Sequence, residues 1–171
     1  MKKILCVLSI ALMVCSCNLF RGNNKAEAAE KKAPAYETLV GSKFLDFEVD
    51  GVKFSDYVGK GKVILVDFWA SWCGPCRGEV PNIAKVYAKY AGERFDVLSV
   101  AVWDKPEDTK AAAEKLGISW DQIINAQRIP TDIYGIEYIP QILLFDADGT
   151  LLAHDLREGE IEKAVKKALG L

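Results

Sequence analysis

Histidine and methionine, which supply many ligands in metal centres, are scarce in this chain. Its 171 residues include one histidine, His154, and two methionines. A structural zinc site normally takes four protein ligands, and His154 lies far in sequence from Cys73 and Cys76, so we expect no metal site. Basic residues are also too few for a nucleic-acid surface. The chain has 22 Lys and Arg against 24 Asp and Glu and no basic run, so no nucleic-acid partner is expected.

Long apolar runs are missing as well, apart from one near the amino terminus. Residues 4–14 are almost wholly apolar and follow two lysines. This run is too short to span a bilayer and too close to the terminus to be a core helix, so it predicts an export signal. The signal ends in Val14-Cys15-Ser16-Cys17, which resembles the bacterial lipobox and implies lipid on Cys17, although Cys15 is an unusual occupant of its position. The alternatives are plain secretion with cleavage nearby and a chance cysteine in a signal peptide.

The chain therefore divides into three parts. Residues 1–17 are expected to be a lipoprotein signal peptide that ends in the lipobox cysteine. Residues 18–35 are small or charged and lack apolar periodicity, which predicts a flexible tether. Residues 36–171 have room for one domain with a substantial core, without repeats. We expect a monomer in the periplasm of a bacterial cell envelope, attached to a membrane through lipid on Cys17.

This division leaves one pair of cysteines in the mature domain. Of the five, Cys6 and Cys15 leave with the signal and Cys17 carries lipid, so Cys73 and Cys76 remain. A disulfide that closes so short a loop restrains the unfolded chain little, which makes it a poor structural staple. An oxidising envelope does not explain a retained dithiol unless the dithiol is used. The pair therefore indicates redox function.

The residues around the pair predict a strand followed by a helix. Lys62–Trp69 is an apolar, β-branched run typical of a strand covered on both faces. Apolar residues then recur at helical spacing, and Pro75 suits a first helical turn. Cys73 is thus expected at the amino end of the helix, where unpaired N–H groups and the helix dipole lower the pKa of a thiol. We expect Cys73 to be the exposed nucleophile and Cys76, one turn further along, to be the buried resolving thiol.

Asp67 interrupts the apolar strand. Burying an ionised carboxylate without a partner is costly, so we expect its pKa to be raised. Lying beneath the helix, it would be the proton acceptor for Cys76. The alternative is that Asp67 caps a neighbouring backbone group or faces water near the end of the strand.

The segment VDFWASWCGPC resembles the active site of thioredoxin. The longer GKVILVDFWASWCGPCRGEVP is similar to the membrane-tethered thiol-disulfide oxidoreductases of the TlpA/ResA-like envelope branch. The resemblance implies an α/β thioredoxin fold, with a central mixed sheet flanked by helices, an N-terminal hairpin and a helical insertion. It places Cys73 and Cys76 on the family's redox pair. Asp67 falls on the buried carboxylate of thioredoxin itself, whereas many relatives in the envelope branch have Asn there.

The resemblance also implies a binding surface for client proteins. Thioredoxin-like folds place a cis-proline beside the redox pair, and Ile139-Pro140 stands at the matching place. Free backbone groups of Ile139 could then pair with an extended client polypeptide. The residues assigned to client binding are Trp72, Gly74, Pro75, Ile139 and Pro140.

The rest of the chain reads as alternating strands and helices. A hairpin is predicted around Asp50-Gly51. The segment 103–132 is longer than in a minimal thioredoxin and resembles the helical insertion of the envelope branch. Within it, Trp120–Ile129 reads as irregular, and Trp103 and Trp120 either line the surface near the redox pair or pack in the core. The other predicted helices and strands are Phe95–Val102, Pro106–Leu116, Tyr138–Phe145, Thr150–His154 and Glu158–Leu169.

The sequence therefore predicts an enzyme that exchanges thiols and disulfides with client proteins. It needs no cofactor beyond the Cys73–Cys76 disulfide, and an upstream membrane electron donor must restore the dithiol. One alternative is a copper-handling or assembly protein on the same fold, for which only His154 could add a ligand. A weaker alternative is a thiol peroxidase. Peroxiredoxins have a Pro-x-x-x-Thr-x-x-Cys pattern, but this chain has Val66 in place of the Pro and Ala70 in place of the Thr before Cys73. An inert docking module would not explain an intact Cys-Gly-Pro-Cys.

Overall fold

The computed structural model describes residues 40–171. The expected signal peptide, its lipid-bearing Cys17, the tether and the first residues of the predicted domain lie outside this range. Among the helices between residues 40 and 171, none combines the length and the apolar character needed to cross a bilayer.

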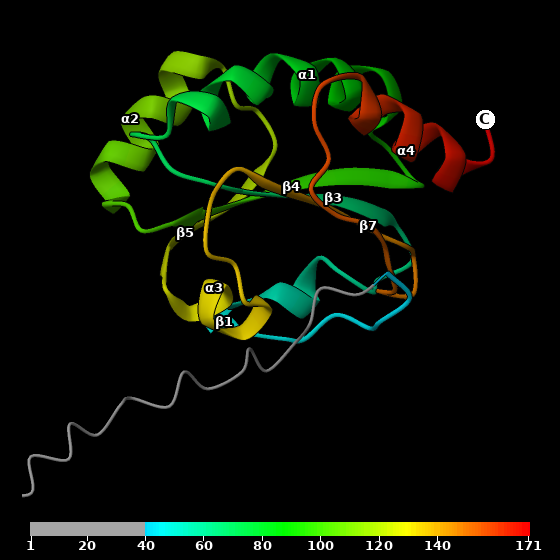
Figure 1. The fold of residues 1–171 in the computed structure, drawn as a ribbon, viewed down its shortest axis with the longest axis horizontal. Helices are drawn as coiled ribbons and strands as arrows, with labels where there is room; N and C mark the ends of the chain where they lie inside the picture. The colour runs from blue at the N-terminus through cyan, green and yellow to red at the C-terminus, as the bar shows by residue number, and fades with distance from the viewer. Residues whose placement is uncertain (1–39) are drawn as a thin grey trace, which may run out of the picture. The chain divides into compact units, whose positions relative to one another are not determined.

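A five-stranded mixed sheet forms the centre of the domain, in the order β5-β4-β3-β6-β7 (Figure 1). β3 is the middle strand and pairs in parallel with β4, which pairs in parallel with β5. On its other side β3 pairs antiparallel with β6, and β6 with β7. The strands are β3 (Val63–Trp69), β4 (Phe95–Val102), β5 (Asp121–Gln127), β6 (Gln141–Phe145) and β7 (Leu151–Ala153). The sheet is mixed, as the resemblance to thioredoxin implied.

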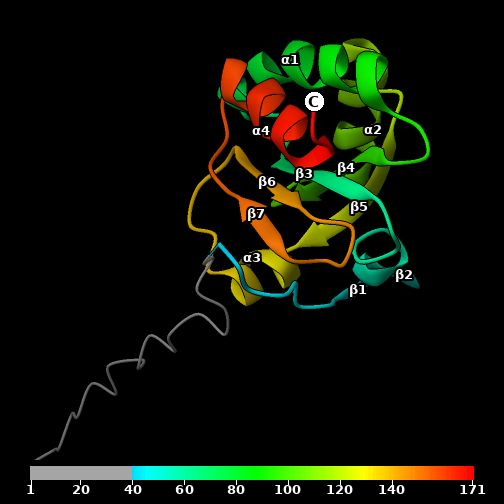
Figure 2. The ribbon, with the colours of Figure 1, turned by 90° about the vertical axis from the view of Figure 1, so that its right-hand side faces the viewer.

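Helices cover one face of the sheet, and a hairpin with a short helix covers the other. α1 (Gly74–Tyr90), α2 (Pro106–Leu116) and α4 (Gly159–Leu169) lie on one side in Figures 1 and 2. The hairpin of β1 (Glu48–Val49) and β2 (Val52–Lys53), the 3-10 turn η1 (Phe54–Asp56) and α3 (Ile129–Tyr134) lie on the other. Side chains alternate along β3, so that Leu65 packs with the apolar faces of α1 and α4 while Val66 and Phe68 pack with the hairpin and α3. All seven residues of β3 are buried, as expected of a strand covered on both faces.

Aromatic packing closes the face that carries the hairpin. Phe54 is fully buried and lies within 4.7–6.1 Å, centroid to centroid, of four other rings. One of them belongs to Tyr134 of α3, whose hydroxyl donates to the Leu45 carbonyl. This packing explains why the hairpin, too short to be stable alone, is ordered.

The prediction of an irregular segment at Trp120–Ile129 is wrong, because Asp121–Gln127 forms the edge strand β5. Its register with β4 shifts beyond Val100, and Asn125 and Gln127 have positive φ angles of 71° and 49°. Such a bulge disrupts strict alternation, which hid the strand from periodicity. Trp120, left open between surface and core, is buried and donates its indole N–H to the Ser99 hydroxyl at 2.8 Å.

Candidate active site

Cys73 caps the amino end of α1. Its backbone is extended (φ −78°, ψ 102°), and its sulfur accepts the backbone N–H of Cys76 at 3.2 Å. The two sulfurs form a disulfide, with Cα atoms 5.3 Å apart. The predicted placement of the pair at a helix start is confirmed. Because the Cys76 N–H points at this sulfur from the positive end of the helix dipole, it favours the thiolate that forms when the disulfide is reduced.

The expectation of an exposed Cys73 is wrong for this disulfide state. Cys73 is only 4% exposed and Cys76 is fully buried. Both pack with Trp69, the last residue of β3, and Ile139 lies against the same cluster. Of the two sulfur-bearing residues, only Cys73 therefore has surface exposed to solvent.

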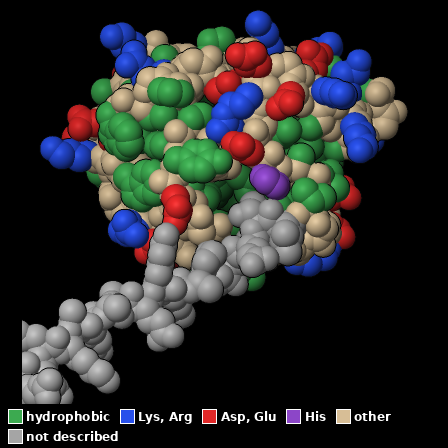
Figure 3. Space-filling model, in the orientation of Figure 1, with side chains coloured by type: hydrophobic (Ala, Val, Ile, Leu, Met, Phe, Trp, Pro, Cys, Tyr) green, Lys and Arg blue, Asp and Glu red, His purple; other side chains and the backbone are tan. Residues whose placement is uncertain are grey.

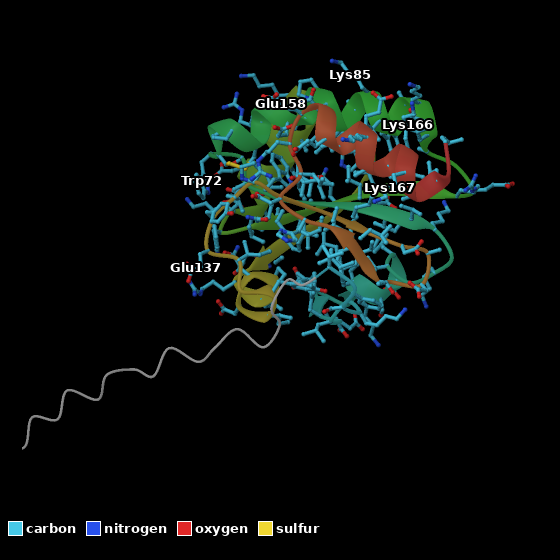
Figure 4. All side chains as sticks on the ribbon, turned by 45° about the vertical axis from the view of Figure 1, so that its right-hand side comes forward. Trp72, Lys85, Glu137, Glu158, Lys166 and Lys167 are labelled. Carbon is cyan, nitrogen blue, oxygen red and sulfur yellow. A yellow bond between two sulfur atoms is a disulfide. The ribbon has the colours of Figure 1, made fainter. Side chains whose placement is uncertain are left out.

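Several exposed residues are neighbours in sequence of the cysteines or of Ile139. Trp72 and Tyr138 are 60% and 58% exposed, and Gly74 and Pro75 are exposed in the first turn of α1. Figure 4 shows Trp72 at the edge of the molecule close to the yellow sulfurs, and Figure 3 shows hydrophobic side chains gathered at the end where α1 begins. Trp72, Gly74 and Pro75 flank the cysteines in sequence, and Ile139 packs against the cysteine cluster.

The connector between β3 and α1 is held by Asp104, which the sequence analysis missed. The buried Asp104 carboxylate accepts the Ser71 backbone N–H at 2.7 Å and the Ser71 hydroxyl at 3.0 Å. Its other donors are the Lys105 N–H and the Thr109 hydroxyl. Trp72 adds a further link by donating its indole N–H to the Trp103 carbonyl at 3.0 Å. The half-buried Trp103 therefore lies next to the redox pair, where it supports the loop.

Asp67 is fully buried in the middle of β3. It shares a face of the strand with Leu65 and Trp69, which is the face covered by α1. Burial raises its pKa to about 7, and the nearby Glu79 adds to the increase, whereas Ser99 and Arg157 lower it. Neither carboxylate oxygen accepts a hydrogen bond of acceptable geometry within residues 40–171. This rules out the alternative that Asp67 caps a backbone group or faces water.

Glu79 is a second buried carboxylate beside the pair, and sequence reasoning did not find it. It follows Cys76 by three residues and so lies on the same face of α1. Its Oε2 accepts the Asn82 side-chain amide at 2.9 Å and the Glu158 backbone N–H at 3.0 Å. The spacing from Cys76 was the available signal, but a charged residue inside a helix is usually solvated.

The Ile139–Pro140 peptide bond is cis, as the resemblance implied. Pro140 is buried and Ile139 is half-buried against the cysteine cluster. Within the described part of the chain, no hydrogen bond engages the Ile139 backbone. Those groups are available to a strand added from outside.

His154 is exposed just beyond β7 and lines a cavity of about 530 Å³ together with residues of α4, including Lys163 and Lys167. Between residues 40 and 171, no three His, Cys, Asp or Glu side chains gather in a way that could hold a metal ion.

Comparison with known proteins agrees with this geometry. The model of the AhpC/TSA family matches residues 29–154. A thiol-disulfide oxidoreductase ResA from Geobacillus thermodenitrificans is 30% identical over 115 residues, and the match spans 64% of this chain and 65% of the relative's length. A Chlorobium tepidum structure assigned to the thiol:disulfide interchange proteins DsbE has 30% identity and a TM-score of 0.68 over 77% of this chain and 99% of that one. The thioredoxin domain of a thiol-disulfide oxidoreductase from Bacteroides vulgatus has 29% identity and a TM-score of 0.63 over 77% and 96% of the two chains. The predicted thioredoxin fold is confirmed.

Proposed function

The chain belongs to the AhpC/TSA family and has the fold and cysteine pair of a thiol-disulfide oxidoreductase, and from this premise we propose that it reduces disulfides of client proteins in a bacterial cell envelope. The observation that carries the proposal is the Cys73–Cys76 disulfide at the amino end of α1. The helix start stabilises a thiolate on the outer cysteine, and the short loop lets the inner cysteine reach it.

The reduced enzyme acts in two steps. The Cys73 thiolate attacks one sulfur of the client disulfide, so a bond between Cys73 and the client forms and the client's second sulfur leaves as a thiolate. Cys76 then loses its proton and attacks the Cys73 sulfur. The Cys73–Cys76 disulfide forms and the client leaves with both sulfurs reduced. Two electrons pass from the cysteine pair to the client, and a membrane electron donor returns them.

Asp67 is the proposed acceptor for the Cys76 proton. A carboxyl group with a pKa of about 7 is partly ionised near neutral pH, so it can take up a proton and release it again. Its position on the α1 face of β3 supports this role, because the thiol of Cys76 is buried on the same side. Asp67 would thus activate the resolving step rather than the first attack.

Client proteins are proposed to bind as an added strand at Ile139. The N–H and C=O groups of that residue give main-chain hydrogen bonds whatever the client's sequence, and the exposed Trp72 and Tyr138 rings give apolar contact. Gly74 and Pro75 complete the surface without bulky side chains. The enzyme would act as a monomer in the periplasm, tethered by lipid on Cys17, as the pattern of residues 1–17 predicts.

Reduction of insulin by dithiothreitol tests the activity. We expect the wild-type protein to accelerate it and Cys73→Ser to abolish the acceleration. Cys76→Ser is the matched variant: reduced, freed of dithiothreitol and then mixed with insulin, it should accumulate a mixed disulfide that is visible on a non-reducing gel. Activity that survives Cys73→Ser would contradict the proposed role of Cys73.

Two further measurements address direction and location. Equilibration with glutathione gives the reduction potential of the pair. A value near the roughly −270 mV of thioredoxin supports a reductant, and one near about −120 mV would indicate an oxidant. Incorporation of labelled palmitate that is lost in Cys17→Ser supports the lipid anchor, and no incorporation would refute it.

A further inference from the structure

The turn between β7 and α4 is bonded to the strand that follows the cis-proline. One guanidinium nitrogen of Arg157, Nη2, donates to the Pro140 carbonyl at 2.5 Å, and Nη1 donates to the Leu156 carbonyl at 2.7 Å. Asp155 pairs with Nη2 at 2.8 Å. The Leu156 N–H donates to the Ile142 carbonyl at 3.1 Å, which extends the pairing of β7 with β6. Arg157 thus joins the turn directly to the residue next to Ile139.

The same turn is bonded to the helix that carries the redox pair. The Glu158 N–H donates to Glu79 Oε2 at 3.0 Å, and Glu79 lies one turn after Cys76. Glu158 has φ 48° and ψ −125°. Residues other than glycine rarely adopt this backbone conformation, and it persists only where surrounding contacts hold it. Figure 4 shows Glu158 where the chain enters α4, beside α1. The turn therefore bridges the client-binding segment and the cysteine helix.

The charge of Arg157 also acts on the buried Asp67. Its side chain is partly buried, with 31% of its surface exposed. Its positive charge lowers the pKa of Asp67 and opposes the effect of Glu79, which lies on α1. Ser99, which faces Asp67 from β4, carries no charge. The cation that acts on Asp67 thus comes from the turn before α4 and is itself paired with Asp155.

We propose that Arg157 is a positioning residue of the redox site, which holds the Pro140 carbonyl so that Ile139 meets the client next to Cys73 and whose positive charge acts on Asp67. This inference rests on the proposed function. It predicts two separable effects, one on client binding and one on the ionisation of Asp67. The two N–H groups of the planar guanidinium, which hold the carbonyls, determine client binding, and its positive charge determines the ionisation of Asp67.

Two Arg157 variants separate the effects. Arg157→Gln removes the charge and the fork, whereas Arg157→Lys keeps the charge but not the planar fork. Lys167→Gln is the matched control, because it removes one positive charge from the exposed face near the far end of α4, as Figure 4 shows. Each variant is assayed for KM and kcat with insulin and for its rate with 5,5′-dithiobis(2-nitrobenzoic acid), a small disulfide that needs no added strand. The ionisation midpoint of Asp67 is followed by ¹³C NMR of the oxidised protein.

We expect Arg157→Gln to raise the KM for insulin several-fold and to raise the Asp67 midpoint. The rate of the first attack of Cys73 on the small disulfide should stay unchanged, because Asp67 acts only in the later resolving step. Arg157→Lys should raise the KM similarly but keep the wild-type midpoint, and Lys167→Gln should change neither. A folded Arg157→Gln protein with the wild-type KM and midpoint would overturn the proposal and leave Arg157 a merely structural residue. If the wild-type protein leaves insulin oxidised, the proposed function fails, while the Asp67 midpoint still tests whether the charge of Arg157 acts on this acid.

Discussion

Replacing Asp67 with asparagine should make the stability of the domain less dependent on pH. The carboxyl group has a pKa of about 7 in the folded protein against a reference value of 3.8. Below both values the group is protonated in the folded and unfolded states and contributes nothing. As the pH rises above 3.8, the unfolded chain releases this proton first, so the folded state loses stability until the pH passes about 7. At about 1.36 kcal/mol per pH unit, the difference between the two values corresponds to about 4 kcal/mol.

The Asp67→Asn variant has no such proton to release. Its free energy of unfolding, relative to the wild-type protein, should therefore increase by about 4 kcal/mol between pH 4 and pH 8. The comparison at pH 4 serves as the baseline, because it contains whatever the buried amide itself costs. This gain is a large share of the roughly 5–15 kcal/mol that stabilises a typical domain, so the acid is expensive to retain.

Urea unfolding of both oxidised proteins at several pH values measures the effect. The slopes of unfolding free energy against urea should agree, which shows that the same surface is exposed in both. Unfolding curves whose difference stays constant from pH 4 to pH 8 would refute the reasoning, since Asp67 would then ionise normally in the folded protein. A slower resolving step in Asp67→Asn, by roughly 10²-fold at neutral pH, would connect the costly acid to proton transfer.

Three further variants test the surroundings of the pair. Glu79→Gln should lower the pKa of Asp67, because a nearby negative charge is removed; ¹³C NMR measures the midpoint, and an unchanged value would contradict the contact. Asp104→Asn should cost about 1–3 kcal/mol in urea unfolding, since an amide cannot accept all the hydrogen bonds that reach this carboxylate from Ser71 and its neighbours; wild-type stability would show that the network is dispensable. Glu158→Gly should raise the thermal midpoint, with a gain of about 1 kcal/mol from relief of the positive φ, and a lower midpoint would show that the backbone is not strained.

Much of the fold was predictable because local signals and burial agree. The helix Pro106–Leu116 was predicted to the residue, since proline suits its first turn and Gly117 ends it with a φ of 68°. The central strand β3 was recognisable from its continuous apolar run. β5 was missed because its polar residues and its bulge, with positive φ at Asn125 and Gln127, resemble a loop.

Site residues were predictable only where their spacing or position in a local sequence pattern indicates their role. Cys73 and Cys76 are defined by their separation, and the raised pKa of Asp67 followed from one carboxylate in an apolar strand. Arg157 and Asp104 could not be found in this way, because their partners are distant in sequence and meet them only through the packing of turns against strand ends. The residues next to them in the sequence are mostly polar or charged, so the sequence pattern does not show that these side chains lie in a packed site.

The disulfide between Cys73 and Cys76 closes a very small ring, and repeated turnover benefits from its size. The two residues are separated by three positions, so opening the bond gives the unfolded chain only about 2 kcal/mol of additional conformational freedom. This amount is small beside the stability of an ordinary domain. The scaffold can therefore pass between its oxidised and reduced forms without melting, and successive cycles need fresh electrons but no refolding.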